Sequence, residues 1–307
     1  MRRENSLISI IIPSFNRKEL INKAIESVLK QNYKCIEIII IDDGSTDGTY
    51  QYLKEKYKKN KSIYIYTNEK NMGAGNSRKI GYNKANGKYV IFMDDDDYYT
   101  NFDFFKQAIQ ILEEKTNIGM VCASSIIEYV SENKFEASIL NIKGEIKKEE
   151  YLQEFQQRYM KSNSTFTTVF RKETLDKANF DDVKMVNDSS IYLRALLEND
   201  AYILDLICGI YRIHSKNITF NLNTDFIIEN LNEKKKIYEE IKKRKLLKDT
   251  NEWLKKQIKL TATYFVKYNK ICNEDFERLI KWCEVNCEDC GEDLVNSLLS
   301  VRGGKII

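Results

Sequence analysis

Residues 36–43 read "IEIIIIDD", an almost unbroken apolar run that ends in two carboxylates. Five isoleucines among its first six residues predict a strand buried on both faces, because a half-exposed strand alternates apolar and polar residues. The runs "LISIII" (7–12) and "KYVIFM" (88–93) have the same character. Strands of this kind belong to parallel sheets with helices on both sides. The sequence therefore predicts an α/β fold.

Strands and helices alternate over about the first 90 residues. Residues 18–30 carry apolar side chains at helical spacing, and a strand is expected at 62–67 between two further helices. Right-handed crossovers would bring the loops that follow these strands to one carboxyl edge of the sheet. Further along we expect a helix at 102–115, a strand at 118–124, a polar connection at 126–165, a strand and helix within 164–178, a helix at 188–199 and a strand at 201–214.

A change of composition near residue 222 predicts a second domain. Beyond it the strand signals stop, and helices are expected at 224–245, 250–268, 273–286 and 291–300. The chain has 307 residues, which is enough for two domains. We therefore expect an α/β domain at 1–222 and a small all-α domain at 223–307.

Composition and charge exclude several classes of protein. A net charge of +3 argues against a dedicated nucleic-acid binder. No apolar run approaches the roughly eighteen residues needed to cross a bilayer, and the apolar stretch interrupted by Pro13 is too short for a signal peptide. Seven cysteines at scattered spacings indicate reduced thiols. We expect a cytoplasmic protein.

Three of these cysteines are candidates for a zinc site. Cys283, Cys287 and Cys290 could face one side of a helix at the spacing i, i+4 and i+7. Their sequence neighbourhood offers no fourth ligand, and Cys283 continues an apolar helix stripe with Phe276 and Leu279. We prefer core cysteines to a metal site.

Carboxylates recur where the predicted strands end. Asp42 and Asp43 follow one strand, and four consecutive aspartates, 94–97, follow another. The carboxyl ends of the strands form the ligand crevice of an open α/β sheet. Oxygen ligands gathered there favour a hard divalent cation, which would offset the repulsion between the carboxylates. A solvated acidic loop is the alternative, although it is less expected directly after a buried strand.

Four motifs in this order resemble the family 2 glycosyltransferases with the GT-A fold. They are "IIPSFNR" (11–17), "IIIIDDGSTDGT" (38–49), "NMGAGNSRKIGYNKANGKYVIFMDDDD" (71–97) and "YRIHS" (211–215). The resemblance implies a Rossmann-like, mostly parallel sheet flanked by helices. It also implies transfer of a sugar from a nucleotide donor, usually a UDP-sugar, with inversion at the anomeric carbon. Residues 223–307 lie outside the resemblance.

The resemblance also assigns roles to residues of the donor site. By position, Pro13, Phe15 and Arg17 would line the nucleoside pocket, and Asp43 would accept a hydrogen bond from the uracil ring. Arg78 would approach the diphosphate. Asp94 and Asp96 form the D-x-D motif, in which Asp94 and Asp95 lie near the donor and Asp96 binds Mn²⁺ or Mg²⁺. The absence of the proline that often follows this motif leaves the shape of the loop uncertain.

An inverting transfer needs a base, and the resemblance points to Asp188. The family commonly has a Glu-Asp pair at the start of a helix, whereas this chain has Asn187-Asp188. Asp181 and Asp182 are rival candidates, and simple capping of the helix is an alternative role for Asp188.

His214 is the only histidine in the chain. In "YRIHS" it matches a family position near the metal and the diphosphate, so we expect a donor contact or a metal ligand. Its neighbour Arg212 is a weaker candidate.

Two other functions and several roles for the C-terminal helices remain open. A catalytically silent nucleotide-sugar-binding module is one alternative, because the first acid of the Glu-Asp pair is missing. A sugar-1-phosphate nucleotidyltransferase is another, although "PSFNRKE" lacks the Gly-rich loop that it requires. The basic stretch "NEKKKIYEEIKKRKLLKD" fits a solvated helix face, a contact with an anionic membrane or a homo-oligomer. The acceptor would be a cell-surface glycan, a lipid-linked oligosaccharide or a protein, within polysaccharide biosynthesis.

Overall fold

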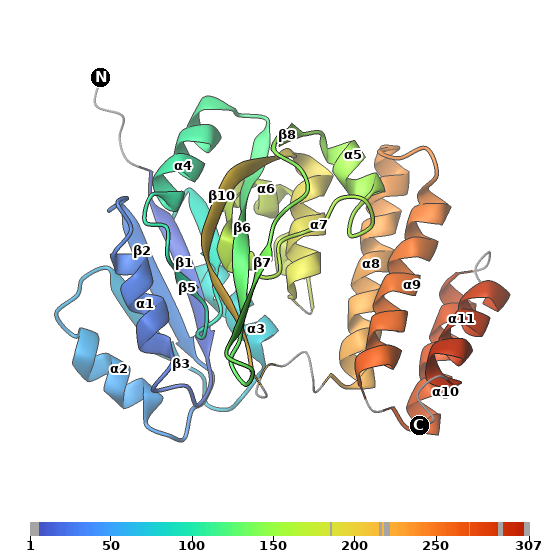
Figure 1. The fold of residues 1–307 in the computed structure, drawn as a ribbon, viewed down its shortest axis with the longest axis horizontal. Coiled ribbons are helices and arrows are strands. Elements are labelled where there is room, and N and C mark those ends of the chain that lie inside the picture. Colours follow the sequence, from blue (N-terminus) through green and yellow to red (C-terminus); the bar gives the residue numbers. More distant parts are fainter. Residues whose placement is uncertain are drawn as a thin grey trace. The chain divides into compact units, whose positions relative to one another are not determined.

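A computed structural model describes residues 6–184, 186–214, 217, 222–269, 271–287 and 291–303. The chain divides into two compact units, Met1–Ile213 and His214–Ile307 (Figure 1). This division lies nine residues before the boundary expected from composition. The two units are described separately.

The first unit contains a ten-stranded sheet with the order β3-β2-β1-β4-β9-β6-β10-β5, in which β7 pairs with β6 and β8 pairs with β10. The strands are β1 (Ile8–Ser14), β2 (Ile36–Asp42), β3 (Ile63–Thr67), β4 (Tyr89–Phe92), β5 (Tyr98–Tyr99), β6 (Ile118–Tyr129), β7 (Lys134–Ser138), β8 (Gly144–Ile146), β9 (Thr168–Arg171) and β10 (Asp200–Ile213). Strands β1 to β4, β6 and β10 share one direction, and the others run against them. The sheet is therefore mostly parallel, as expected.

Helices pack on both faces of this sheet, which explains the continuous apolar strands. They are α1 (Ile21–Leu29), α2 (Thr49–Tyr57), α3 (Ala74–Lys84), α4 (Phe104–Glu114), α5 (Lys148–Gln153), α6 (Lys172–Lys177) and α7 (Asp188–Glu198), with short 3₁₀ turns at Thr165–Thr167 and Phe180–Asp182. Ile10 and Ile12 of β1 join one core cluster with α1 and α4. Ile11 points to the other face, where it contacts α3 so closely that a Cβ on Gly81 would lie 2.4 Å from its Cγ2.

The segment 126–165 is more ordered than the expected polar connection. Strand β6 extends to Tyr129 and pairs with β7, and β8 pairs with β10 ahead of α5. The prediction missed these elements because β7 and β8 are short and polar. Their backbone partners lie on longer strands, so a local pattern carries little trace of the pairing.

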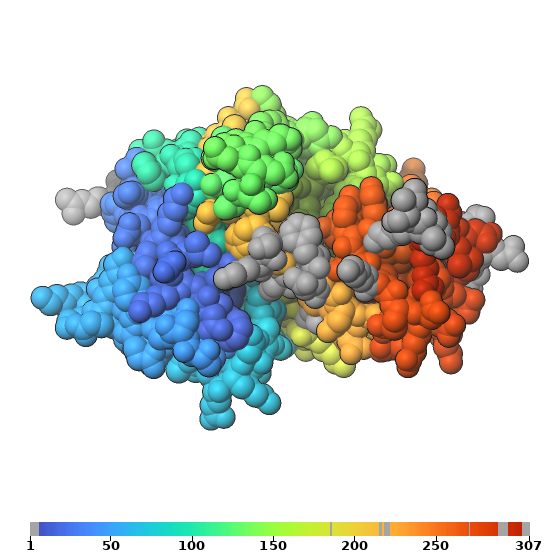
Figure 2. Space-filling model, turned by 60° about the horizontal axis from the view of Figure 1, so that its bottom comes forward, coloured from blue at the N-terminus to red at the C-terminus, as the bar shows by residue number. Residues whose placement is uncertain are grey.

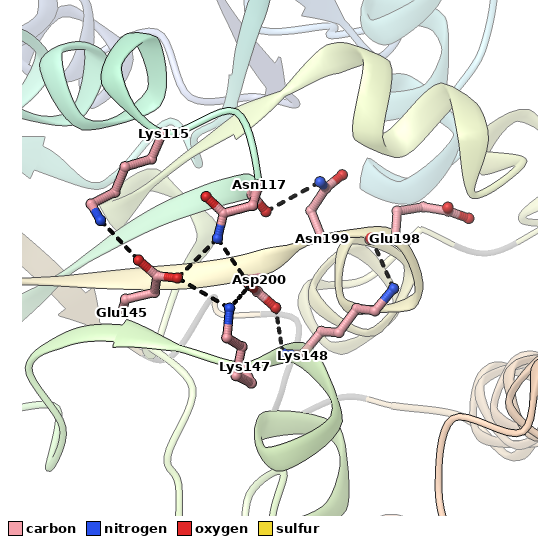
Figure 3. A network of polar contacts seen from close by, with 8 residues as sticks. All are labelled: Lys115, Asn117, Glu145, Lys147, Lys148, Glu198, Asn199 and Asp200. Atoms are coloured by element: carbon pink, nitrogen blue, oxygen red, sulfur yellow. Dashed lines mark hydrogen bonds and ion pairs between the residues drawn. The ribbon is translucent and has the colours of Figure 1, made fainter.

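A network of hydrogen bonds and ion pairs connects β8 to the amino ends of β6 and β10 (Figure 3). The carboxylate of Asp200 accepts hydrogen bonds from Lys147 Nζ at 2.8 Å, Asn117 Nδ2 at 3.0 Å and the main-chain N–H of Lys148 at 2.9 Å. Glu145 of β8 accepts from Asn117 Nδ2 and from Lys115 Nζ, both at 2.9 Å. Since Asp200 begins β10, this network lies at the end of β10 opposite its carboxyl terminus.

The second unit consists of four helices in its described part, and all four agree with the expected ranges. They are α8 (Thr224–Arg244), α9 (Thr250–Tyr268), α10 (Asn273–Asn286) and α11 (Gly291–Gly303), drawn in orange and red in Figure 2. The side chains of Asn223 and Asp249 cap α8 and α9 by accepting from main-chain N–H groups at 2.8 and 2.9 Å. Among the described residues, no helix combines the length and the apolar character that a membrane span requires.

The cysteine predictions have a mixed outcome. Cys283 is buried in α10, as a core residue should be. Cys290 lies outside the described residues. Five cysteines are free thiols, but the expectation of reduced thiols is wrong for Cys287, which is disulfide-bonded.

Candidate functional site

The loops that follow β1 and β2 meet at one edge of the sheet. Parallel pairing sets Pro13 beside Ile41 and Ser14 beside Asp42. Asn16 then takes a left-handed conformation (φ 53°), and its side chain accepts a hydrogen bond from the N–H of Thr46 at 2.8 Å. Pro13 is buried within β1, whereas Phe15 is 40% exposed. The two loops thus form one continuous rim with an exposed aromatic ring.

Asp43 is buried at this rim and organises the loop ahead of α3. Its carboxylate accepts hydrogen bonds from Asn68 Nδ2 and from the main-chain N–H groups of Met72 and Gly73, at 2.8 to 2.9 Å. Asp42 instead stabilises the loop that follows β2. Its Oδ2 accepts hydrogen bonds from the N–H of Ser45 and from Thr67 Oγ1. Both carboxylates thus support the loops at this edge, and the contact of Asp43 with a uracil ring stays a prediction.

The four aspartates after β4 are mostly buried and have different partners. Asp95 accepts a hydrogen bond from Ser14 Oγ at 2.7 Å, and Asp96 lies 3.8 Å from Arg17. Asp97 is fully buried and accepts from Ser164 Oγ and from the main-chain N–H of Arg212. Burial raises the pKa of Asp95 to about 8, and the carboxylate of Asp96 adds to this rise.

Arg78 connects this acidic motif to the predicted base. It projects from α3, is 7% exposed, and places its two terminal nitrogens 2.5 Å from Asp94 Oδ1 and 3.3 Å from Asp188 Oδ1. Burial alone would lower the pKa of Arg78, but the two carboxylates outweigh it and raise the pKa above its ordinary value. Its Nε is buried without a hydrogen-bond partner. One guanidinium thus bridges two carboxylates that are 94 residues apart in sequence.

Asn187, and not Asp188, caps helix α7. Its side-chain oxygen accepts a hydrogen bond from the N–H of Ser190 at 2.9 Å. In turn, Ser190 Oγ accepts a hydrogen bond from the N–H of Asn187, and the two bonds form a capping box. Asp188 therefore stands in the first turn with its carboxylate toward Arg78 and 22% exposed. The rivals Asp181 and Asp182 are exposed residues of a 3₁₀ turn. The missing acid at position 187 is thus replaced by a helix cap.

The motif "YRIHS" crosses the division between the two units. Arg212 belongs to β10, where its Nε pairs with Glu128 at 2.9 Å. His214 begins the second unit, and its N–H donates to Asn217 Oδ1 at 2.5 Å. Ser215 lies outside the described residues. The role expected of His214 stays a prediction.

Sequence reasoning missed three side chains at this edge. Ser14 and Ser164 bind the buried carboxylates of Asp95 and Asp97. Lys161 lies close enough to Asp188 and Arg78 for both to affect its pKa, which burial lowers. Ser14 follows the strand predicted at 7–12, so its place at this edge was expected from the sequence, but its contact with Asp95 was not. The irregular segment around Lys161 and Ser164 offered none.

The donor set fits a divalent cation that is shared with a substrate. Among the described residues, no three His, Cys, Asp or Glu side chains converge as a complete metal site. Mg²⁺ in nucleotide sites commonly takes only one or two carboxylates and completes its shell with substrate phosphates and water. Asp94 and Asp96 offer two carboxylates in a motif where burial, and then the neighbouring carboxylates, raise the pKa of Asp94, Asp95 and Asp97. A bound cation would offset this cost of ionising them. Asp94 and Asp96 would hold the ion.

Comparison with known proteins identifies the family. Residues 9–178 match the model of Glycosyl transferase family 2. The GalNAc(5)-diNAcBac-PP-undecaprenol beta-1,3-glucosyltransferase of Campylobacter jejuni is 30% identical over 211 residues, which cover 67% of this chain and 64% of that protein. The putative teichuronic acid biosynthesis glycosyltransferase TuaG of Bacillus subtilis is 35% identical over 123 residues, or 40% of this chain and 46% of that protein. This chain thus spans less than two thirds of the length of either relative.

Solved structures with low sequence identity share the fold. S. aureus TarS 1–349 in complex with UDP-GlcNAc superposes with a TM-score of 0.70 at 18% identity, covering 97% of this chain and 90% of that one. The mannosyltransferase PcManGT from Pyrobaculum calidifontis, in complex with GDP-Man and Mn²⁺, gives a TM-score of 0.52 at 14% identity, covering 97% and 74%. Because the family model matches more than half of the chain, this protein belongs to glycosyl transferase family 2, and it has the GT-A fold.

Proposed function

We propose that this glycosyltransferase is inverting and metal-dependent, and that it moves a sugar from a UDP-sugar to a hydroxyl of a cell-surface glycan, a lipid-linked oligosaccharide or a protein. The observation that carries the proposal is the bridge from Asp94 through Arg78 to Asp188. It places a carboxylate suited to proton transfer beside the acidic motif that would face the diphosphate. The UDP-GlcNAc complex of TarS and the undecaprenol-linked substrate named for the Campylobacter relative support this choice of donor and acceptor.

The nucleoside would bind at the rim formed after β1 and β2. Asp43 would accept a hydrogen bond from the uracil N3–H, since among the described residues its Oδ2 accepts one hydrogen bond, from the N–H of Gly73. The exposed ring of Phe15 offers a surface for the base, with Pro13 at the floor. Arg17, next to Asp96, brings a positive charge to the phosphate side. Asp95 would remain in its contact with Ser14, behind the residues that face the donor.

The leaving diphosphate would lie between the acidic motif and Arg78. A divalent cation held by Asp94 and Asp96, Mn²⁺ or Mg²⁺, would stabilise the negative charge that develops as the anomeric C–O bond breaks. Arg78 has two terminal nitrogens and an unpartnered Nε, so it can exchange a carboxylate for phosphate oxygens without losing every partner. His214 is proposed as an additional contact to the diphosphate or the ion.

Asp188 would act as the general base. When the acceptor hydroxyl attacks the anomeric carbon from the side opposite the diphosphate, its proton passes to the carboxylate of Asp188. Such assistance is commonly worth about 10²- to 10⁴-fold in rate. Asn187 holds Asp188 in the first turn of α7 through the capping box, which fixes the direction from which the base can act.

Two substitutions separate donor binding from transfer. A thermal-shift screen of nucleotide sugars, with and without Mn²⁺, first identifies a donor, and its slow hydrolysis then reports turnover. Asp188→Asn should retain metal-dependent donor binding and lose about 10²- to 10⁴-fold in turnover, whereas Asp96→Asn should lose the metal-dependent binding. Asp182→Asn, an exposed rival, is the matched control and should behave as the unaltered protein. Full activity of Asp188→Asn would refute the base assignment, and tight UDP binding without turnover of any donor would indicate the silent module.

The helical unit is proposed to contact the cytoplasmic face of the membrane. In α8, basic side chains cluster toward the carboxyl end, where Arg244 and Lys243 are partly paired with Glu240. Binding to vesicles that contain anionic phospholipid at low salt, lost at high salt, would support this contact. A concentration-dependent mass in solution without vesicle binding would instead support a homo-oligomer formed through these helices.

A further inference from the structure

Lys161 belongs to the segment between α5 and β9, which runs along the edge of the site. Its Nζ donates to the carbonyl of Ser162 at 2.9 Å and lies 5.9 Å from the centre of the Tyr192 ring. Tyr192 stands one turn beyond Asp188 on α7. Three residues after Lys161, Ser164 donates to the buried carboxylate of Asp97. The segment is therefore held to the acidic motif while Lys161 lies beside the helix that carries the base.

Among the residues that the structure describes, none forms a direct ion pair with Lys161. Within the described part of the chain, no carboxylate oxygen lies within 4.0 Å of its Nζ, whereas surface lysines such as Lys88 do find one, Glu113 at 2.8 Å. Burial lowers the pKa of Lys161, and the more distant carboxylate of Asp188 only partly offsets this effect. Lys161 is half-buried, and a cation partly removed from water without a direct counter-ion costs free energy. A ligand anion would offset that cost.

The order of the strands shows which part of the site Lys161 serves. The nucleoside rim is built by β1 and β2, and β4 with the acidic motif follows on one side of β1. The segment of Lys161 leads into β9, which is the next strand beyond β4. Lys161 therefore lies on the far side of the acidic motif from the nucleoside, in the half of the site where the sugar is transferred.

We propose that Lys161 binds a phosphate oxygen of the substrate in this half of the site, and so acts as a second cation beside Arg78. Lysine binds phosphate as a point charge and needs no fixed fork geometry. The phosphate is either the β-phosphate of the donor or a phosphate of a lipid-linked acceptor. The inference rests on the proposed function, because it requires a nucleotide diphosphate at the acidic motif.

Calorimetric titration with UMP, UDP and inorganic phosphate, each in the presence of Mg²⁺, tests the proposal on the full chain. The variants are Lys161→Met, which keeps an unbranched side chain of similar length without the charge, and Lys161→Arg, which keeps the charge. Lys143→Met is the control, because it also removes one positive charge but from an exposed pair with Asp205. Inorganic phosphate is titrated into protein already saturated with UDP, so that it reports a phosphate site outside the donor.

Two results support the proposal and distinguish the source of the phosphate. If Lys161 binds the donor, Lys161→Met raises the Kd for UDP about 10- to 100-fold and the Kd for UMP less than about twofold. Lys161→Arg then restores most of the lost affinity. If it binds the acceptor, UDP and UMP are unchanged, and the binding of inorganic phosphate to the UDP-saturated protein is lost in Lys161→Met alone.

Other results overturn it. Unchanged binding of all three ligands in Lys161→Met, or an equal loss for UMP and UDP, would leave Lys161 with a structural role only. If the unaltered protein binds none of the three ligands, the proposed donor is wrong and this inference fails with it. If the unaltered protein binds UDP and Lys161→Met binds all three ligands equally well, this inference alone is refuted.

Discussion

Substitution of Asp200 by asparagine tests whether burial sets the strength of the network at the amino end of β10. Its side chain is 11% exposed and accepts hydrogen bonds from Lys147, Asn117 and the N–H of Lys148. Asn has one oxygen and one NH₂ group, so at least one of these donors would face another donor. Asp205 on the same strand also pairs with a lysine, Lys143 at 2.6 Å, but is 70% exposed. The two Asp→Asn variants therefore differ mainly in burial.

The expected size of the effect follows from these contacts. The buried donor left unsatisfied costs about 1–2 kcal/mol. The pair with Lys147, whose side chain is 64% exposed, contributes only about 0.5 kcal/mol. Asp200→Asn should thus lower the free energy of unfolding by about 2 kcal/mol, or about 4–8 °C in Tm for a unit of this size. Asp205→Asn should change it by less than about 0.5 kcal/mol.

The pH dependence gives a second check on the same variant. Burial would raise the pKa of Asp200, but the hydrogen bonds from Lys147, Lys148 and Asn117 lower it below the ordinary value. The ionised Asp200 therefore contributes to the free energy of unfolding above its pKa in the unfolded chain, about 4. This contribution is lost as the pH falls through the lower pKa of Asp200 in the folded protein. Urea unfolding followed by circular dichroism measures this effect. The difference in the free energy of unfolding between the unaltered protein and Asp200→Asn should become smaller from pH 7 to pH 3. Equal losses for Asp200→Asn and Asp205→Asn, or a gap independent of pH, would refute the reasoning.

Three further substitutions address the packing of α3, the cap of α7 and an acid with a low pKa. Gly81→Ala places a Cβ 2.4 Å from Ile11 Cγ2, and should cost about 1–3 kcal/mol in urea unfolding; an unchanged midpoint would contradict the close packing. Asn187→Ala removes the bond to the N–H of Ser190 and should cost about 1 kcal/mol in thermal unfolding, while Asn187→Asp should retain the cap; equal stability of both variants would contradict the capping role. Burial works against ionisation of Glu113, but hydrogen bonds from lysine, serine and tyrosine bring its pKa down to about 2. Because its side chain is 30% exposed, Glu113→Gln should cost only about 1 kcal/mol at pH 7, and this cost should disappear between pH 4.5 and pH 2; a cost that persists at pH 2 would contradict the ion-pair account.

The parts of the fold that were predictable have strong local signals. The isoleucine runs of β1 and β2 could only be strands buried on both faces, and the apolar stripes of α8 to α11 repeat at helical spacing. The acids after β2 and β4 had to reach one edge, because parallel strands end there. These signals need no knowledge of distant residues.

The parts that were not predictable depend on contacts between distant segments. Nothing near Lys161 indicates that α7 passes beside it, and nothing near Lys134–Ser138 indicates pairing with β6. Asn187 was interpreted as a missing acid, although "NDSS" also has the form of a capping box. In that case the signal was present in the sequence, and a comparison with the family motif concealed it.

The stretch between β8 and β9 is held at both ends by hydrogen bonds to residues of the sheet and its loops. Glu145 and Asp200 hold its beginning, and Ser164 with Asp97 holds its end. Tyr151, Leu152 and Phe155 within the stretch are fully buried, so substitutions there would disturb the packing of the unit. Gln157, Arg158 and Met160 are exposed and can change without that cost. We therefore expect tolerated substitutions to gather at these exposed positions and to leave the anchoring residues unchanged.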